Sequence, residues 1–172
     1  MDESNNAPSA DNQQERLNAT IQPWFISGFV YGEGSFHVAV AKRTDLPQKF
    51  VLIPEFHVSQ NRERASVLSE IQSYFGCGYI KENHRSRVND VSQEYVVRRR
   101  EDLLNRIIPF FEQYPLRSQK GEDFKIFAQV VKAMDIGHHH SPEGFSLLVS
   151  LAYGMNGAGK YRKILLKNII SH

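Results

Sequence analysis

The sequence of 172 residues has a single cysteine, Cys77, and no apolar run long enough to span a membrane. One cysteine excludes an internal disulfide framework and a zinc site built from cysteines, and it fits a reducing compartment. The N-terminus also lacks the apolar core of a secretory signal. Hydrophobic residues make up 41% and charged residues 23%, which is typical of a globular domain with no membrane partner.

Acidic residues are scarce in the second part of the chain, and none follows Glu143. Four of the acids lie in the first twenty residues, so the rest of the chain carries 20 bases against 15 acids. The bases occur in short clusters, the last of which spans residues 160–167. Such clusters suit a polyanionic partner, although charge alone favours an ordinary solvated surface.

The pattern along the chain predicts one α+β domain at residues 20–172, preceded by a flexible arm at residues 1–19 that has few apolar anchors. A short helix is expected from Thr20–Pro23 to Gly32 or Glu33. Period-two alternation predicts strands at 35–43 and 50–60, joined by a hairpin loop. Further expected elements are a helix at 63–75, strands at 79–83 and 94–98, helices at 101–113, 120–134 and 142–153, and a short basic helix at the end. The order α-β-β-α-β-β-α predicts four antiparallel strands with helices on one face and the other face open.

The stretch GFVYGEGSF, residues 28–36, contains one acid among three glycines. Gly28 and Gly32 share a helix face and allow a second backbone to approach closely. Glu33 falls at the helix C-terminus, where the helix dipole is already negative, so an acid is unfavourable there unless a cation is bound. The carboxylate of Glu33 and the carbonyl of Gly32 would be hard oxygen ligands suited to magnesium. An exposed acid in a glycine-rich turn is an equally good explanation.

The longer segment ISGFVYGEGSF, residues 26–36, resembles the signature of the LAGLIDADG homing endonucleases, which Gly28, Gly32, Glu33 and Gly34 match. Tyr31 departs from the signature, since an acid is common at that position, and we assign it no role. The resemblance is to single-motif members encoded in organelle introns. It implies that the signature helix packs against a second copy through Gly28 and Gly32. It also implies that Glu33, with Gly32, binds the catalytic metal, magnesium or manganese.

Three more segments extend the resemblance to about residues 23–163. FHVSQNRER, residues 56–64, resembles the strand end that carries a glutamine and a basic residue into the active site, here Gln60 and Arg64. YPLRSQKGEDF, residues 114–124, resembles the segment that carries an active-site lysine, here Lys120, with Arg117 as the alternative. Residues 141–163 resemble the terminal helix and basic tail. The implied catalytic residues are therefore Glu33, Gln60, Arg64 and Lys120, although without the resemblance each also reads as an ordinary surface residue.

The family lays its sheet along the major groove of DNA, so residues on the open face of the sheet become candidates for base contacts. If Phe36 and Val38 face the core, the odd-numbered residues of the first two strands face the groove. Phosphate contacts are expected from bases in loops and in the tail. The predicted DNA-binding residues are His37, Ala39, Ala41, Arg43, Val51, Ile53, Glu55, His57, Lys81, Asn83, Arg85, Arg87, Arg98 and Lys160.

One signature supplies one catalytic acid, whereas cutting both strands of DNA requires two. The sequence therefore predicts a homodimer that cleaves a long, partly palindromic DNA site by metal-dependent hydrolysis. Half of a larger fused protein is the less favoured arrangement, because both ends of the chain look natural. The alternative function is a maturase-type protein that binds intron RNA without cleaving. If the gene is organellar, the protein belongs in the mitochondrion or chloroplast.

Two further motifs resemble functional sites but are better explained otherwise. Residues 154–161, GMNGAGKY, approach the P-loop pattern, but Tyr161 replaces the hydroxyl residue that holds magnesium, and a helix precedes the stretch. Residues 138–144, HHHSPEG, suggest a metal site. Adjacent histidines in a loop rarely converge on one ion, and a helix cap at Ser141 explains the segment as well.

Overall fold

The structure is a computed structural model that describes residues 21–84, 91–158, 162 and 164–170. The first half contains α2 (Pro23–Glu33), β1 (Gly34–Lys42), β2 (Phe50–Asn61), the 3-10 turn η1 (Arg62–Arg64), α3 (Ser66–Phe75), β3 (Tyr79–His84) and β4 (Val91–Val97). The second half is helical, with α4 (Arg100–Asp102), the π-helical segment η2 (Leu103–Ile107), α5 (Ile108–Gln113), α6 (Ser118–Asp135), η3 (His138–His140), α7 (Pro142–Ala158) and α8 (Lys167–Ile170). The predicted order αββαββα is confirmed.

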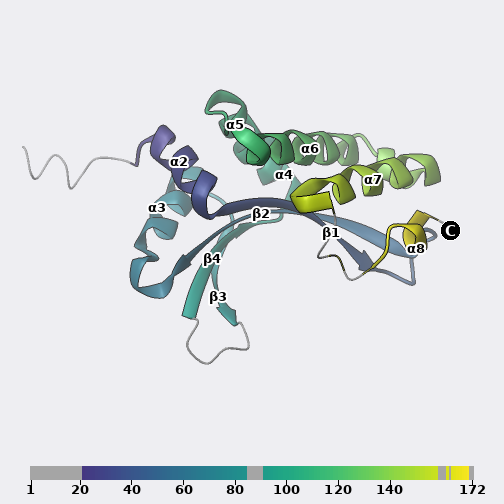
Figure 1. The fold of residues 1–172 in the computed structure, drawn as a ribbon, viewed down its shortest axis with the longest axis horizontal. Coiled ribbons are helices and arrows are strands. Elements are labelled where there is room, and N and C mark those ends of the chain that lie inside the picture. The colour runs from purple at the N-terminus through teal and green to yellow at the C-terminus, as the bar shows by residue number, and fades with distance from the viewer. Residues whose placement is uncertain (1–20, 85–90, 159–161, 163, 171–172) are drawn as a thin grey trace, which may run out of the picture.

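The four strands form one antiparallel sheet in the order β1-β2-β4-β3. Figure 1 shows α5, α6 and α7 lying along one face of the curved sheet, while none of these three helices covers the opposite face. The predicted α+β architecture with an open sheet face is therefore confirmed. No helix in the described parts of the chain combines the length and hydropathy that a membrane crossing requires.

The core lies between the sheet and these helices. Most even-numbered residues of β1 and β2, such as Phe36, Val38 and Phe56, are buried, as the alternation predicts. The ring of Phe36 packs against the ring of Phe56 at 5.1 Å and against Phe127 of α6 at 5.4 Å between centroids. The odd-numbered residues consequently point to the open face.

Two helices differ from their predicted form. The helix expected from residue 63 begins at Ser66, because residues 62–64 form a 3-10 turn in which the Ala65 amide bonds the Arg62 carbonyl. The helix expected at 101–113 is interrupted by η2, where the Ile108 amide bonds the Leu103 carbonyl five residues back. Pro109 follows at once and has no amide hydrogen, so it cannot complete the regular α-helical pattern.

The last part of α7 turns away from helical geometry and attaches to the sheet. Asn156 has a left-handed backbone (φ 50°), and its side-chain amide donates to the Phe36 carbonyl at 2.8 Å. Its backbone amide donates to the buried Asp123 carboxylate of α6 at 3.2 Å. Arg162 donates to the Val38 carbonyl at 2.8 Å. These bonds fix the helical layer to β1.

Candidate active site and open sheet face

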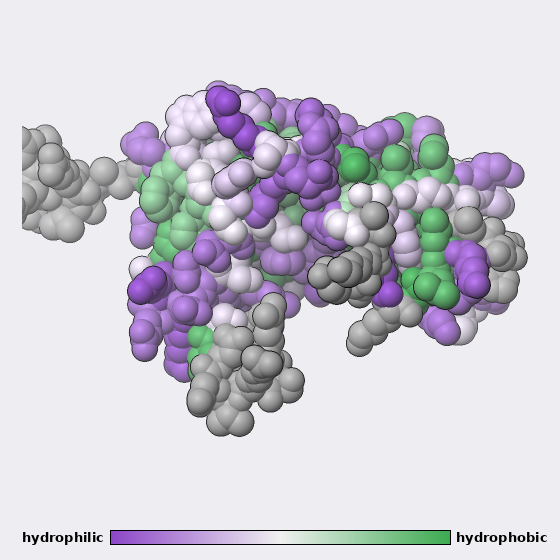
Figure 2. All heavy atoms as spheres, viewed as in Figure 1, coloured by the Kyte–Doolittle hydropathy of each residue, from purple (hydrophilic) through white to green (hydrophobic). Residues whose placement is uncertain are grey.

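Helix α2 has one buried face and one exposed face. Ile26 and Val30 are fully buried, and the Ser27 hydroxyl donates to the Tyr114 carbonyl at 2.7 Å, which holds the helix against the core. The opposite face exposes Gly28 and Gly32 together with Trp24, Phe25 and Tyr31, whose side chains are 62%, 53% and 49% exposed. Figure 2 shows hydrophobic surface at this end of the molecule. An apolar stripe this exposed on one helix is typical of an interaction surface.

The glycines of α2 and of the junction after it serve different purposes. A Cβ atom at Gly28 or Gly32 would meet nothing within 4 Å, so the fold of the single chain does not require glycine at either position. A Cβ at Gly34 would lie 2.6 Å from Val30 Cγ1 and 2.8 Å from the Val30 carbonyl oxygen. Gly34 therefore permits the immediate change from α2 to β1, and Glu33 is the exposed last residue of the helix.

Lys120 lies at the junction between α2 and β1, although it comes from the first turns of α6. Its Nζ donates to the Gly34 carbonyl at 2.5 Å and to the Val30 carbonyl at 3.2 Å. Burial lowers the pKa of this ammonium, while the negative charge of Glu33 acts in the opposite direction. The structure thus brings the predicted lysine and the predicted acid together across almost ninety residues of sequence.

The other two predicted catalytic residues lie at and just after the end of β2, with Gln60 inside the strand and Arg64 in the turn that follows. Gly34, the first residue of β1, pairs with Val58 of β2. Gln60 comes two residues after Val58, so in this antiparallel pair it extends past the start of β1 toward the C-terminus of α2. The Gln60 carbonyl oxygen Oε1 accepts from the Asn61 amide at 2.8 Å. Arg64 is exposed in η1, immediately after this strand. Glu33 and Lys120 therefore meet at the junction, Gln60 lies in the strand that pairs with β1, and Arg64 lies in the turn after that strand.

Arg117, the alternative to Lys120, occupies a different place. It lines a hollow of about 290 Å³ beside the exposed face of α2, with Trp24, Gly28 and Tyr31 among the other lining residues. The geometry therefore favours Lys120 over Arg117 as the base beside Glu33.

Three residues near Lys120 had no role assigned from the sequence: Tyr31, Ser118 and Asp123. The Tyr31 hydroxyl lies 3.1 Å from the Ser118 hydroxyl, which ties the end of α2 to the first residue of α6. Ser118 has a left-handed backbone (φ 52°) at this position. Asp123 is buried one turn after Lys120 and holds Asn156, as described above. No local pattern marks these residues, because their partners are remote in sequence.

The open sheet face carries the predicted base-contacting residues in register. His37 pairs with Glu55, Ala39 with Ile53, and Ala41 with Val51, so each of these pairs lies side by side on that face. Lys81 pairs with Glu94 across β3 and β4, and its ammonium lies 3.2 Å from the Glu94 carboxylate. Asn83 pairs with Ser92. Three predicted contact residues, Arg85, Arg87 and Lys160, lie outside the described residues.

Arg43 and Arg98, like Lys81, are already paired with acidic residues of the chain. Arg43 follows β1 and forms a two-point ion pair with the exposed Asp45, at 2.7 and 2.8 Å. Arg98 follows β4 and donates to Glu55 Oε2. Both guanidinium groups remain exposed, so solvent or another anion can still reach them.

Glu55 differs from the prediction that it faces a bound base. The residue is only 5% exposed, whereas the side chains around it, His37, His57 and Arg98, are 31%, 22% and 51% exposed. Burial acts to raise the pKa of this carboxyl, but the neighbouring His57, Arg98 and His37 outweigh burial and lower the pKa to about 2. We infer that the basic side chains around Glu55, rather than Glu55 itself, offer the outermost polar atoms at this position.

Replacing Glu55 with glutamine is expected to lower stability at neutral pH, and the loss should shrink in acid. The folded pKa of Glu55 is depressed from 4.5 to about 2, so its stabilising effect is complete above about pH 4.5 and disappears as the pH falls toward 2. The shift corresponds to at most about 3–4 kcal/mol of stability. Urea unfolding of the wild type and of Glu55→Gln between pH 7 and pH 3 measures this difference in stability. Glu112→Gln, at an exposed acid paired with Lys132, should cost under about 1 kcal/mol at every pH. A loss for Glu55→Gln that is independent of pH would contradict the assignment.

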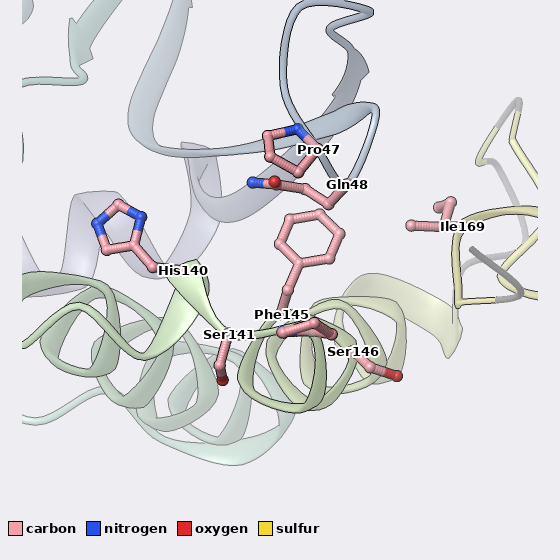
Figure 3. Close-up of a pocket in the computed structure, with 8 residues that line it drawn as sticks. Pro47, Gln48, His140, Ser141, Phe145, Ser146 and Ile169 are labelled. Atoms are coloured by element: carbon pink, nitrogen blue, oxygen red, sulfur yellow. The ribbon is translucent and has the colours of Figure 1, made fainter.

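The histidine segment at 138–140 forms η3 and leads into α7. The Ser141 hydroxyl accepts from the Gly144 amide at 3.0 Å, so the predicted helix cap is confirmed. His140 lines a cavity of about 270 Å³ between the β1–β2 loop, α7 and α8. Figure 3 shows Phe145 pointing toward Pro47 and Gln48 in this cavity, which contains none of the predicted catalytic residues. Of the P-loop-like stretch, residues 154–158 are described and belong to α7, while residues 159–161 lie outside the described residues.

The fold is that of homing endonucleases, as solved structures show. The structure matches the homing endonuclease I-TnaI with a TM-score of 0.77 and 31% identity over 89% of this chain and 98% of that chain. It also matches the LAGLIDADG homing endonuclease I-SmaMI bound to cleaved DNA, with a TM-score of 0.74 and 27% identity over 90% of this chain and 54% of that chain. The model of the LAGLIDADG endonuclease family matches residues 26–131. The chain belongs to this family, and the predicted resemblance is confirmed.

The first curated relatives that the chain matches are longer than the chain itself. A probable intron-encoded endonuclease of Neurospora crassa is 34% identical over 155 residues, which is 88% of this chain and 33% of the relative. The chain spans about a quarter to a third of the length of the first curated relatives that it matches.

Proposed function

We propose that the protein is a site-specific, divalent-metal-dependent endonuclease that cleaves double-stranded DNA as a homodimer. The observation that carries this proposal is the junction between α2 and β1, where Lys120 reaches the end of the helix that carries Glu33. This junction lies at one end of a sheet face that no helix of the main layer covers (Figure 1). DNA as the substrate is supported by the match to I-SmaMI, which is described as bound to cleaved DNA.

The residues at the junction fit a hard divalent cation such as Mg²⁺ or Mn²⁺. Glu33 is exposed at the negative end of a helix dipole, with the Gly32 carbonyl adjacent, and both ligand atoms are oxygen. Such an ion, when bound, supplies an activated water and stabilises charge on phosphate oxygens. In this proposal Lys120 stabilises the developing negative charge, Arg64 contacts the phosphate, and Gln60 orients the attacking water. None of these groups acts as a covalent nucleophile.

The exposed face of α2 is the proposed dimer interface. Gly28 and Gly32 leave room for close backbone approach, and Trp24 and Phe25 supply apolar area beside them. A two-fold axis along this face would bring two copies of Glu33 together, one for each DNA strand. The target would then be at least partly palindromic.

The open sheet face is proposed to read the DNA sequence. Arg98, together with His37 Nδ1 and His57 Nε2, the ring nitrogens that do not face Glu55, is proposed to contact base edges. Ala39 and Ile53 offer apolar contacts suited to thymine methyl groups. Arg62, Arg85, Arg87 and Lys160 are proposed as phosphate contacts. A mixed polar and apolar surface of this kind favours sequence reading over purely electrostatic binding.

The direct test incubates the purified chain and Mg²⁺ with a library of random DNA duplexes and sequences the cleaved products. Enrichment of one partly palindromic site, cut on both strands, is expected. Cleavage without sequence preference, or no cleavage under any divalent ion, would contradict the proposal.

Replacing Lys120 with methionine is expected to slow cleavage by about 100- to 1000-fold, because a fixed positive charge beside the scissile phosphate is lost. Single-turnover cleavage of the selected site measures the rate, and gel-shift titration measures DNA affinity. The matched variant Arg117→Met should slow cleavage by less than about tenfold, because Arg117 lies beside the interface rather than at the junction. If Arg117→Met slowed cleavage more than Lys120→Met, the active-site positive charge would have to be assigned to Arg117.

The second candidate is an RNA-binding, maturase-type protein that has lost cleavage. Curated relatives are described as intron-encoded, and the open sheet face would also suit a folded RNA. The assembly of Glu33 and Lys120 favours the nuclease, since binding alone does not require it. Because these relatives are intron-encoded, we also propose that the gene lies in an intron of a mitochondrial or chloroplast genome.

A further inference from the structure

Three potential metal ligands converge on the open sheet face, away from the junction of Glu33 and Lys120. His37 comes from β1, and Glu55 and His57 come from β2, with His37 and Glu55 paired across the two strands. Glu55 Oε1 lies 3.8 Å from His37 Nε2 and 3.5 Å from His57 Nδ1. The three ligand atoms all lie within 4.8 Å of one another. The geometry is that of three groups arranged around one small volume.

The hydrogen bonding at this cluster is incomplete. His57 Nδ1 is buried and lies 3.5 Å from Glu55 Oε1, a long contact that does not have the geometry of a regular hydrogen bond. Arg98 donates to the other carboxylate oxygen, Oε2, so Oε1 is left facing the two imidazole rings. A buried nitrogen without a partner costs free energy, and a cation shared with Oε1 would satisfy it.

The donor set selects a transition metal rather than magnesium. Two imidazole nitrogens and one carboxylate oxygen are typical of Zn²⁺ sites that keep an open fourth position. Bonds of about 2 Å in tetrahedral geometry separate two ligand atoms by about 3.3 Å. The observed distances of 3.5 and 3.8 Å to Glu55, and a separation of up to 4.8 Å between the ligand atoms, require inward side-chain movements of up to about 1.5 Å.

We propose that His37, Glu55 and His57 bind one Zn²⁺ ion, in a site separate from the oxygen ligands at Glu33. The ion would link β1 to β2 on the open face. The nearby positive charges are Arg98, which Glu55 balances, and Arg162, which acts on His37 from a distance. With Zn²⁺ bound, this part of the face becomes positively charged, which suits a polyanionic partner. The proposal does not depend on the nuclease activity, because metal binding is measured without DNA.

The test titrates the full chain, freed of metal by a chelator that is then removed, with Co²⁺ and Zn²⁺. Co²⁺ should give the intense visible absorption of tetrahedral coordination with one ion bound per chain, and Zn²⁺ should displace it. Zn²⁺ should also raise the melting temperature of the protein by binding the folded state alone. His57→Gln and His37→Gln should each weaken Co²⁺ binding by more than about tenfold and remove the tetrahedral spectrum.

Two controls separate this site from the other metal-binding groups. A variant with glutamine at His138, His139 and His140 should keep the spectrum, and Glu33→Gln should keep it as well. Circular dichroism identifies any variant that fails to fold, and His37→Gln is the safer of the two tests because the His37 side chain, at 31%, is more exposed than that of His57, at 22%. The absence of a tetrahedral Co²⁺ spectrum in the wild-type chain would overturn the proposal. So would a spectrum that persists in folded His37→Gln but disappears in the histidine-segment variant.

Discussion

Replacing Glu33 with glutamine is expected to lower the cleavage rate by about 1000-fold or more while DNA binding persists. The change removes the charged ligand that we assign to the divalent ion, and the lost charge stabilisation of several kcal/mol corresponds to at least three factors of ten. Binding should be retained or slightly tighter, because one negative charge is removed from a surface that faces a polyanion. Single-turnover cleavage and gel-shift titration of the selected site measure the two effects separately.

The same substitution makes a distinctive prediction about stability. Glu33 is the exposed last residue of α2, where a negative charge opposes the helix dipole. Glu33→Gln should therefore leave the melting temperature unchanged or raise it, by a contribution of about 0.3–1 kcal/mol. Glu70→Gln, at an exposed acid of α3, serves as the matched control and should cleave at the wild-type rate. If Glu33→Gln cleaves normally, the metal site has been assigned to the wrong residue.

Much of the fold was predictable because it rests on local periodicity. Alternating apolar residues in β1 and β2 fixed both strands and their buried face, and the glycines with Pro23 bounded α2. The interruption at η2 was not predicted, although Pro109 was visible, because a proline can equally begin a new helix or kink an existing one. The start of α3 was predicted at residue 63 rather than at Ser66, because a 3-10 turn of three residues is too short to show a hydrophobic pattern of its own.

The site was predictable only in part, since its remaining contacts join segments remote in sequence. The resemblance nominated both Lys120 and Arg117, and only the packing of α6 against the end of α2 separates them. Tyr31 had no role in the sequence, whereas its hydroxyl lies beside Ser118, 87 residues away. Glu55 was expected to face a base, because strand alternation gives the face of a residue but not the register of β4 that brings in Arg98.

Replacing Gly28 with leucine is expected to prevent dimerisation and, with it, double-strand cleavage, while the single chain stays folded. A side chain at Gly28 meets nothing within 4 Å in the chain, and leucine is the better helix former by up to about 1 kcal/mol. In the proposed dimer the same side chain would sit between two closely packed helices. Overpacking of about 1–3 kcal/mol in each protomer would raise the dissociation constant by about 30-fold or more.

Gly154→Leu provides the matched control, because Gly154 is also exposed in a helix, α7, and its added Cβ would likewise meet nothing within 4 Å. Light scattering across a range of concentrations should show a dimer for the wild type and for Gly154→Leu, but a monomer for Gly28→Leu. Cleavage of both strands should follow the dimer, because each protomer contributes one Glu33. A wild-type chain that remains monomeric and still cuts both strands would show that the second acid does not come from a second copy. A dimeric, fully active Gly28→Leu would place the interface on a surface other than the exposed face of α2.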